Sequence, residues 1–165
     1  MIEKANLSQL PQIMEVYAVA RAFMANNGNP LQWGQSYPAE EMIRQDILNG
    51  KCYVNLKENA IAAVFYFAVE EDPTYRVIDG AWLNDAPYGV IHRIAVAHNG
   101  KGVAGECFRF ALERCENLRI DTHEDNIPMQ RCLAKHGFTR CGIIYLKDGD
   151  PRIAYQKVVS SWSEN

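Results

Sequence analysis

The sequence contains no apolar stretch that approaches the roughly 20 residues needed to cross a membrane. Its longest apolar run, residues 61–69, has the length of a strand. Basic residues are not in excess either, because 17 lysines and arginines face 20 aspartates and glutamates and give a net charge of −3. The two signs are intermixed, so no basic stripe could follow a nucleic-acid backbone. We therefore predict that the protein binds neither a membrane nor nucleic acid, and that its ligands are small.

Paired cysteines are also lacking. The five cysteines are odd in number and form no CxxC pair, and the N-terminus does not resemble a signal peptide. We interpret them as reduced thiols in a cytoplasmic protein, and we predict no bound metal. A chain of 165 residues is long enough to bury roughly two-thirds of its unfolded surface, so we predict one domain over residues 1–165.

The most informative segment of the chain, residues 88–115, joins an apolar run, a glycine loop and an amphipathic stretch without a gap. This pattern predicts a strand, a tight turn and a helix. Glycines at positions 100, 102 and 105 let backbone N–H groups approach a ligand, and the positive end of the helix dipole points to the same place. A pyrophosphate fits such a turn, and either a dinucleotide or coenzyme A could supply it.

The remaining elements follow from hydrophobic periodicity and turn residues. We expect an edge strand at residues 1–5 and a helix capped by Ser8, then a short helix with Pro38 in its first turn that ends at Gly50. A hairpin of residues 52–57 and 60–69 precedes the glycine segment. After that segment we predict a strand at 118–122, a helix at 124–137 that ends on Gly137, and a hairpin of 138–146 and 152–159.

The dinucleotide alternative fits this layout less well. The letters of residues 100–105 satisfy GxGxxG, and Asp121 lies near the end of the next strand, where a ribose-binding acid belongs. However, that fingerprint normally follows the first strand of its fold, and here it follows three predicted strands and leaves about 60 residues. We keep it as an alternative.

The predicted order of elements resembles the GNAT superfamily of N-acetyltransferases over nearly the whole chain. The resemblance implies a mixed α/β (α+β) domain with a mostly antiparallel sheet, helices on both faces, and a splay between the fourth and fifth strands. The family loop reads Gln or Arg, any two, Gly, any one, Gly or Ala. The stretch from Asn99 to Ala104 matches it everywhere except at Asn99.

By the same resemblance, the cofactor is acetyl-CoA or coenzyme A. The phosphates would contact the loop backbone, and the free edge of the fourth strand would bond the pantetheine arm like a missing strand. Asn126, which opens the next helix before a closing Gly137-Phe138, would contact the same cofactor. The predicted cofactor residues are Ile94, Ala95, Val96, Asn99, Gly100, Lys101, Gly102, Val103, Ala104, Gly105 and Asn126.

The candidate catalytic residues are less well defined. Many family members carry a tyrosine in the later helix that protonates the departing thiolate, but this chain has Leu133 there. His92 interrupts an apolar strand near the expected acetyl group, so it is either a base or water relay, or a structural histidine. His123 is the rival base, although its surroundings also fit a helix cap. Tyr145 could replace the missing acid, or it is a core tyrosine.

Three aromatic residues, Trp33, Tyr37 and Trp82, lie in segments that wall the acceptor site in GNAT-like folds. They suggest an acceptor with an apolar or flat portion, although Trp33 could equally serve packing. The sequence thus predicts transfer of an acetyl group from acetyl-CoA to a primary amine on a small molecule or peptide, by direct attack within a ternary complex. The sequence leaves open whether the protein forms a homodimer. A non-catalytic acyl-CoA binding or sensing module is the further alternative.

Overall fold

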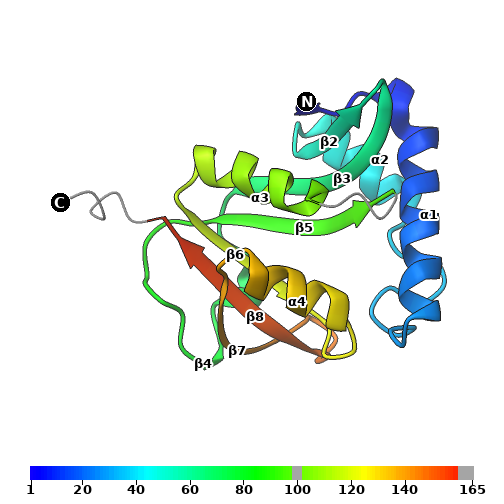
Figure 1. Cartoon of the computed structure of the whole chain (residues 1–165). Helices are drawn as coiled ribbons and strands as arrows, with labels where there is room; N and C mark the ends of the chain where they lie inside the picture. Colours follow the sequence, from blue (N-terminus) through cyan, green and yellow to red (C-terminus); the bar gives the residue numbers. More distant parts are fainter. Residues whose placement is uncertain (98–101, 160–165) are drawn as a thin grey trace. The chain divides into compact units, whose positions relative to one another are not determined.

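The computed structural model describes residues 1–97 and 102–159. Within these residues, eight strands form one sheet in the order β1-β2-β3-β5-β6-β8-β7-β4 (Figure 1). The β5–β6 pair is parallel, and the other registered pairs are antiparallel. This confirms the predicted fold class. The described residues include no helix long and apolar enough to cross a membrane.

The contacts divide the chain into two compact units, and each is described by itself. The first comprises Met1–Phe67 and His92–Phe108, and the second comprises Ala68–Ile91 and Arg109–Asn165. The unit boundaries fall within β3, β5 and α3. That residues 1–165 act as one domain stays a prediction.

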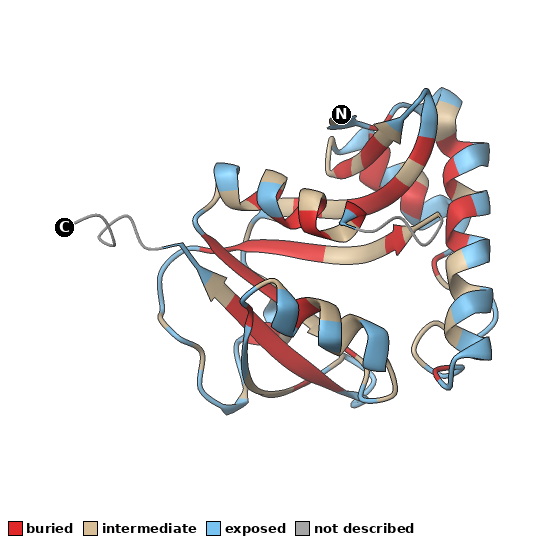
Figure 2. Ribbon diagram, in the orientation of Figure 1, coloured by how far each residue is buried: buried red, intermediate tan, exposed pale blue. Residues whose placement is uncertain are grey.

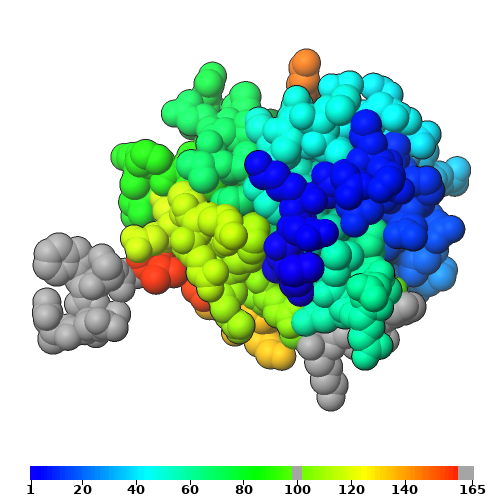
Figure 3. Space-filling view, turned by 90° about the horizontal axis from the view of Figure 1, so that it is seen from above, coloured from blue at the N-terminus to red at the C-terminus, as the bar shows by residue number. Residues whose placement is uncertain are grey.

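The first unit contains the N-terminal elements and the second part of β5. Its helices and strands are β1 (Ile2–Lys4), α1 (Leu10–Asn26), α2 (Glu40–Leu48), β2 (Cys52–Lys57), most of β3 (Ala60–Val69), the end of β5 (Gly89–Val96) and the start of α3 (Val103–Arg114). The predicted β2–β3 hairpin is confirmed, and its turn residues Glu58 and Asn59 both have positive φ, as a two-residue hairpin turn requires. In Figure 3 the dark blue N-terminal residues lie on the surface beside blue-green residues, in agreement with the edge position of β1.

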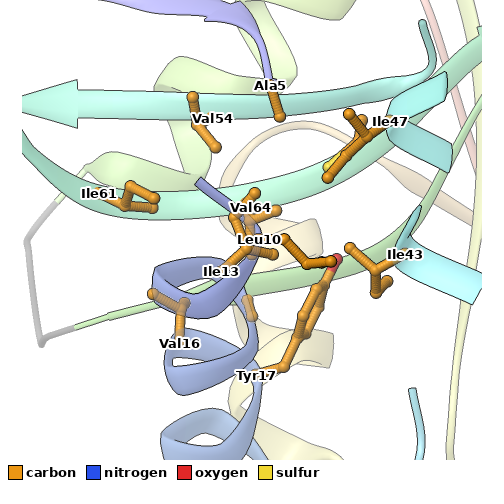
Figure 4. Packing of buried hydrophobic residues seen from close by; sticks show 12 residues of the cluster. Ala5, Leu10, Ile13, Val16, Tyr17, Ile43, Ile47, Val54, Ile61 and Val64 are labelled. Atoms are coloured by element: carbon orange, nitrogen blue, oxygen red, sulfur yellow. The ribbon is translucent and has the colours of Figure 1, made fainter. Parts of the chain in front are cut away.

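The core of the first unit lies between the sheet and the two N-terminal helices. Buried residues run along one side of α1 (Figure 2). Figure 4 shows side chains of α1 and α2 directed toward β2 and β3, and the cluster includes Leu10, Ile13, Tyr17, Ile43, Ile47, Val54, Val64 and Ala95. Asn55, the neighbour of Val54 on β2, instead bonds Glu106 of α3. Because neighbouring strand residues face opposite sides, α3 covers the second face, as predicted.

Two predicted helix starts are wrong in detail. A short 3-10 turn, Leu7–Gln9, precedes α1, and Asn6 caps it through a capping box with Gln9, so Ser8 is not the cap. Pro38 precedes the α2 cap residue Ala39 and does not lie in the first turn. In both cases the predicted residue lies within two positions of the observed cap.

The second unit contains the C-terminal strands and α4. Its elements are a 3-10 turn (Pro73–Tyr75), β4 (Asp79–Gly80), the start of β5, the end of α3, β6 (Asn117–Thr122), α4 (Ile127–Lys135), β7 (Thr139–Tyr145) and β8 (Pro151–Val158). Gly137 follows α4 with φ 81°, and the N–H of Phe138 bonds the carbonyl of Leu133 at 3.0 Å. This confirms the predicted left-handed cap.

The short strand β4 was not predicted. It pairs with β7 through Gly80 and Gly142, where a Cβ added to Gly80 would lie 2.2 Å from the carbonyl oxygen of Cys141. Only glycine permits that approach at φ 130°. Because β4 exists and contains two residues, the strands predicted as fourth and fifth are β5 and β6 here.

The ladder between β5 and β6 is short. It joins Gly89 to Leu118 and Val90 to Arg119 at the start of both strands. Beyond these pairs β5 continues to Val96 and β6 continues to Thr122. A parallel pair that is bonded only at its first residues is what the predicted splay requires.

Candidate active site

The predicted phosphate loop is described in part. Asn99, Gly100 and Lys101 lie outside the described residues. Gly102 is exposed, with φ 87°, and a Cβ added to it would meet nothing within 4 Å. Val103 and Ala104 then begin α3, while the buried Gly105 lies inside the helix rather than in the loop. The first N–H groups of α3 therefore follow directly after a backbone position that favours glycine.

An acid lies in the first turn of α3, where the predicted anion would bind. Glu106 accepts hydrogen bonds from Lys57 at 2.7 Å and from Asn55 at 2.8 Å, both on β2. These bonds lower the pKa of Glu106, so its carboxylate is charged and paired. Lys57 thereby neutralises the negative charge nearest to the helix start.

A left-handed residue lies in β5 just before the predicted pantetheine segment. Arg93 has φ 50°, a left-handed conformation that costs a residue with a side chain about 1–3 kcal/mol. The hydroxyl of Tyr17 on α1 donates to the Arg93 carbonyl at 2.8 Å. After Arg93, Ala95 enters the core, and Ile94 and Val96 are half-buried. The N–H of Ala97 bonds the carbonyl of Ala62 at 2.8 Å.

The side chain of Arg93 is held from several elements. Its Nε and Nη2 lie 3.0 and 2.8 Å from Oδ2 of Asp46 on α2, and its Nη1 donates to the Tyr37 hydroxyl at 3.3 Å. The exposed fractions of the Arg93 and Asp46 side chains are 14% and 12%. Burial raises the pKa of Asp46, and the guanidinium of Arg93 opposes that rise. Arg93, a charged residue in an otherwise apolar strand, therefore has a buried partner of opposite charge.

His92, the first candidate base, is half-buried beside this ion pair. Its ring lies 5.6 Å, centroid to centroid, from that of Tyr66 on β3. The guanidinium carbon of Arg93 lies 4.8 Å from the centre of the same Tyr66 ring. The imidazole therefore belongs to a cluster of polar and aromatic groups rather than to the apolar core.

Two predicted acceptor residues lie in the same unit and contact one another. Trp33 packs edge-on against Tyr17 at 5.7 Å and lies 6.0 Å from Tyr37, measured between ring centroids. Trp33 also packs against the core cluster, so it contributes to packing as well. Through the hydroxyl of Tyr37, the same loop contacts Arg93. Arg93 thus bonds Tyr37, which contacts Trp33. It also shares the ring of Tyr66 with His92.

Trp82, the third predicted acceptor residue, lies in the second unit beside a different arginine. The guanidinium of Arg119 lies between the rings of Trp82 and Tyr88, at 4.1 and 4.0 Å. Its Nη2 donates to the carbonyl of Asn84, and burial lowers its pKa. Trp82 in turn donates to the carbonyl of Tyr75 at 2.9 Å.

Asp121, which the dinucleotide alternative assigned to a ribose, has an internal partner. The buried Tyr75 donates its hydroxyl to Asp121 at 2.6 Å. Burial and this carboxylate raise the pKa of Tyr75 well above its usual value. The hydroxyl therefore stays protonated as a hydrogen-bond donor to Asp121.

His123 and Asn126 build the turn that begins α4. Nδ1 of His123 accepts the N–H of Asp125 at 3.0 Å, and its carbonyl accepts the N–H of Asn126. Asn126 is the N-cap residue, and its Oδ1 accepts from Met129 at 3.1 Å. These bonds agree with the helix-cap interpretation of the segment.

Leu133, at the position of the usual tyrosine, and Tyr145, the candidate acid for the thiolate, differ in burial. Leu133 is fully buried within α4, and Tyr145 at the end of β7 is 49% exposed. The interpretation of Tyr145 as a core residue is therefore wrong, because it ends a strand next to the turn that leads to Pro151. Cys52 and Cys107 are buried, which raises the pKa of each thiol to about 12 and makes both poor nucleophiles.

The sequence analysis did not identify the residues that contact Arg93 and His92. Asp46 lies between Ile43 and Ile47 on the buried side of α2, and an acid on an apolar helix face is a signal that could have been used. Tyr17 and Tyr66 gave no such signal, since each fits the apolar pattern of its own element.

Comparison with known proteins identifies the fold. A model of the acetyltransferase (GNAT) family matches residues 17–138. A solved GNAT-family acetyltransferase from Streptococcus agalactiae is 34% identical with a TM-score of 0.89, over 98% of this chain and 96% of that chain. One from Listeria monocytogenes is 20% identical with a TM-score of 0.71, over 96% and 94%.

A structure of the NatC complex bound to Gag peptide and CoA is 13% identical with a TM-score of 0.63, over 97% of this chain and 98% of that chain. The last two likenesses show the fold alone. A search of curated proteins returned no match. The family match and the first structure show that this chain belongs to the GNAT family of acetyltransferases, a family that uses acetyl-CoA and acts on amine-bearing acceptors.

Proposed function

We propose that this protein is an acetyl-CoA-dependent N-acetyltransferase that acetylates a primary amine by direct attack within a ternary complex. Membership of the GNAT family over residues 17–138 is the observation that carries the proposal. The CoA in the solved NatC complex, which has the same fold, supports the choice of cofactor. The five free cysteines are consistent with the reducing cytoplasm, which we propose as its location.

The residues after the proposed phosphate loop fit this cofactor. Gly102 leaves open space where a Cβ would stand, and α3 begins at the next residue. Phosphate oxygens would accept hydrogen bonds from the first N–H groups of α3, with the loop residues Asn99, Gly100 and Lys101 before them. Ile94, Ala95 and Val96 would bond the pantetheine arm, and Asn126 would contact the same cofactor. Acetyl-CoA supplies the activated acetyl thioester.

The chemical demand on the protein is to deprotonate the acceptor. If the acceptor is a lysine-like amine with a pKa of about 10.4, its neutral form at pH 7 costs about 4.6 kcal/mol. His92 would take one proton from the ammonium, directly or through water, and the neutral nitrogen would then form the C–N bond as the C–S bond breaks. The second proton that the nitrogen loses balances the proton that the departing thiolate takes up. His123 is the second candidate base, and Tyr145 is the candidate acid for the thiolate.

The acceptor is proposed to be a small molecule or peptide with an apolar or flat portion. Trp33 and Tyr37 support this in the first unit, and Trp82 supports it in the second. Aromatic rings bury a large area against such a ligand and also attract an alkylammonium group.

One observation favours the alternative of a non-catalytic acyl-CoA module. Leu133 is fully buried in α4, where many family members carry the tyrosine that protonates the thiolate. This loss does not prevent catalysis by itself, because a thiol with a pKa of about 8.5 is already a fair leaving group.

Two assays separate these functions. CoA at one hundred times its dissociation constant should add about 2.7 kcal/mol of stability, which raises Tm by about 5–11 °C, and NAD should not. Release of free thiol from acetyl-CoA should then depend on an added amine from a panel of small amines and peptides. Protection by NAD alone would favour the dinucleotide alternative. Protection by CoA without thiol release for any amine would favour the non-catalytic module.

A further inference from the structure

Arg93 contacts several elements through both its backbone and its side chain. Its carbonyl accepts from Tyr17 on α1, and its guanidinium bonds Asp46 on α2 and Tyr37 in the loop before α2. Tyr66 on β3 lies against the same guanidinium and against the ring of His92. All these contacts lie within the first unit.

The contacts fix two different things. The Tyr17 bond and the left-handed φ fix the backbone of Arg93, and hence the direction in which the preceding residue, His92, leaves the strand. The guanidinium fixes the loop that carries Trp33 and Tyr37, because Tyr37 is bonded to it and Trp33 packs against Tyr37. Arg93 therefore holds both the strand segment that carries the candidate base and the loop that carries Trp33 and Tyr37.

We propose that Arg93 is a positioning residue for the acceptor side of the reaction. Through its bonds to Asp46 and Tyr37 it holds the loop that carries Trp33 and Tyr37 in a fixed position relative to His92. The inference rests on the proposed function. An ion pair that served stability alone would have no selective effect on the acceptor. A guanidinium suits this arrangement, because its separate nitrogens reach both partners: Nε and Nη2 bond Asp46 while Nη1 bonds Tyr37.

The test is a double-mutant cycle on the kinetics of the acceptor amine. The variants are Tyr37→Phe, Asp46→Asn and the double variant, with Arg44→Gln on the exposed side of α2 as the charge-removing control. We expect each single variant to lower kcat/KM for the amine about tenfold, because loosened positioning acts on the reacting geometry. The dissociation constant of acetyl-CoA should stay within about twofold of the parent value.

The double variant should lose clearly less than the product of the two single losses, since both changes release the same guanidinium. Asp46→Glu, which keeps a carboxylate for Arg93, should recover part of the loss, and Arg44→Gln should behave as the parent. Multiplicative losses, or an equal loss of acetyl-CoA affinity, would overturn the proposal. If Asp46→Asn does not fold, Tyr17→Phe replaces it as the second arm, because it frees the Arg93 carbonyl without leaving a charge unpaired.

Hydrogen exchange supplies a readout that needs no activity. Loss of the anchor should reduce protection in peptides that cover residues 29–37 and 91–96, and leave the β7–β8 hairpin unchanged. If the parent acetylates no amine in the panel, the proposed function fails, and the exchange pattern alone decides whether Arg93 holds the loop. Unchanged protection in both peptides of the Tyr37→Phe and Asp46→Asn variants would overturn the proposal even in an active enzyme.

Discussion

Removal of the Asp46 carboxylate should destabilise the protein strongly. The Asp46 and Arg93 side chains are 12% and 14% exposed, so Asp46→Ala leaves a guanidinium charge buried without its carboxylate. Breaking a buried pair in this way costs about 3–5 kcal/mol. For a chain of this size, about 2–4 °C of Tm is lost per kcal/mol, which gives a decrease of about 6–20 °C.

The matched comparison is the exposed pair between Lys57 and Glu106, whose side chains are 47% and 36% exposed. Lys57→Ala should cost about 1 kcal/mol or less, because solvent screens that pair. Urea unfolding of both variants at pH 7, followed by circular dichroism, measures the two losses under the same conditions. A loss for Asp46→Ala no larger than that for Lys57→Ala would refute the reasoning from burial. A double Asp46→Leu, Arg93→Met variant should recover much of the stability, since no charge then remains buried.

Three further predictions concern the site. Gly102→Val should weaken CoA binding at least tenfold by calorimetry without a change in the circular dichroism spectrum, because at φ 87° a side chain is strained and would fill the proposed phosphate position; unchanged affinity would remove CoA from this loop. His92→Ala should lower kcat about a hundredfold while acetyl-CoA affinity stays near the parent value, with recovery as the pH approaches the pKa of the amine; a parental rate would make His123 the next residue to test. The lowered pKa of Glu106 stabilises the fold above the unfolded value of 4.5, and this contribution is lost as the pH falls through the folded pKa. Glu106→Gln should therefore reduce the difference in unfolding free energy, measured with urea, between pH 7 and pH 3 by roughly 1 kcal/mol or less, and an unchanged difference would contradict the assigned hydrogen bonds.

Elements with a strong local signal could be predicted from the sequence. The β2–β3 hairpin has a two-residue turn of Glu58 and Asn59 between β-branched and aromatic runs, and Gly137 ends a periodic helix. Both signals lie within a few residues of the structure that they determine. The strand β4 has no such signal, because two residues show no periodicity and are paired only through the close approach of Gly80 and Gly142.

The site was predictable to a smaller extent. His92 and Arg93 stand out because polar residues interrupt an apolar strand, and this indicates that at least one of them enters a polar cavity or finds a buried partner. The identity of the partner could not be predicted, since Asp46 is 47 residues away in sequence and reaches Arg93 only through the packing of α2. The left-handed φ of Arg93 has no sequence signal either, because tertiary bonds from Tyr17 and Asp46 maintain it.

Acetylation of an amine is the most direct test of the central claim. The parent protein, incubated with acetyl-CoA carrying a labelled acetyl group and with the amine panel, is followed by mass spectrometry of the amines and by free thiol. We predict that at least one amine gains one labelled acetyl group, with one equivalent of thiol released per amide formed. Tight CoA binding with no labelled amine and no thiol release would contradict the assignment of this protein as an N-acetyltransferase.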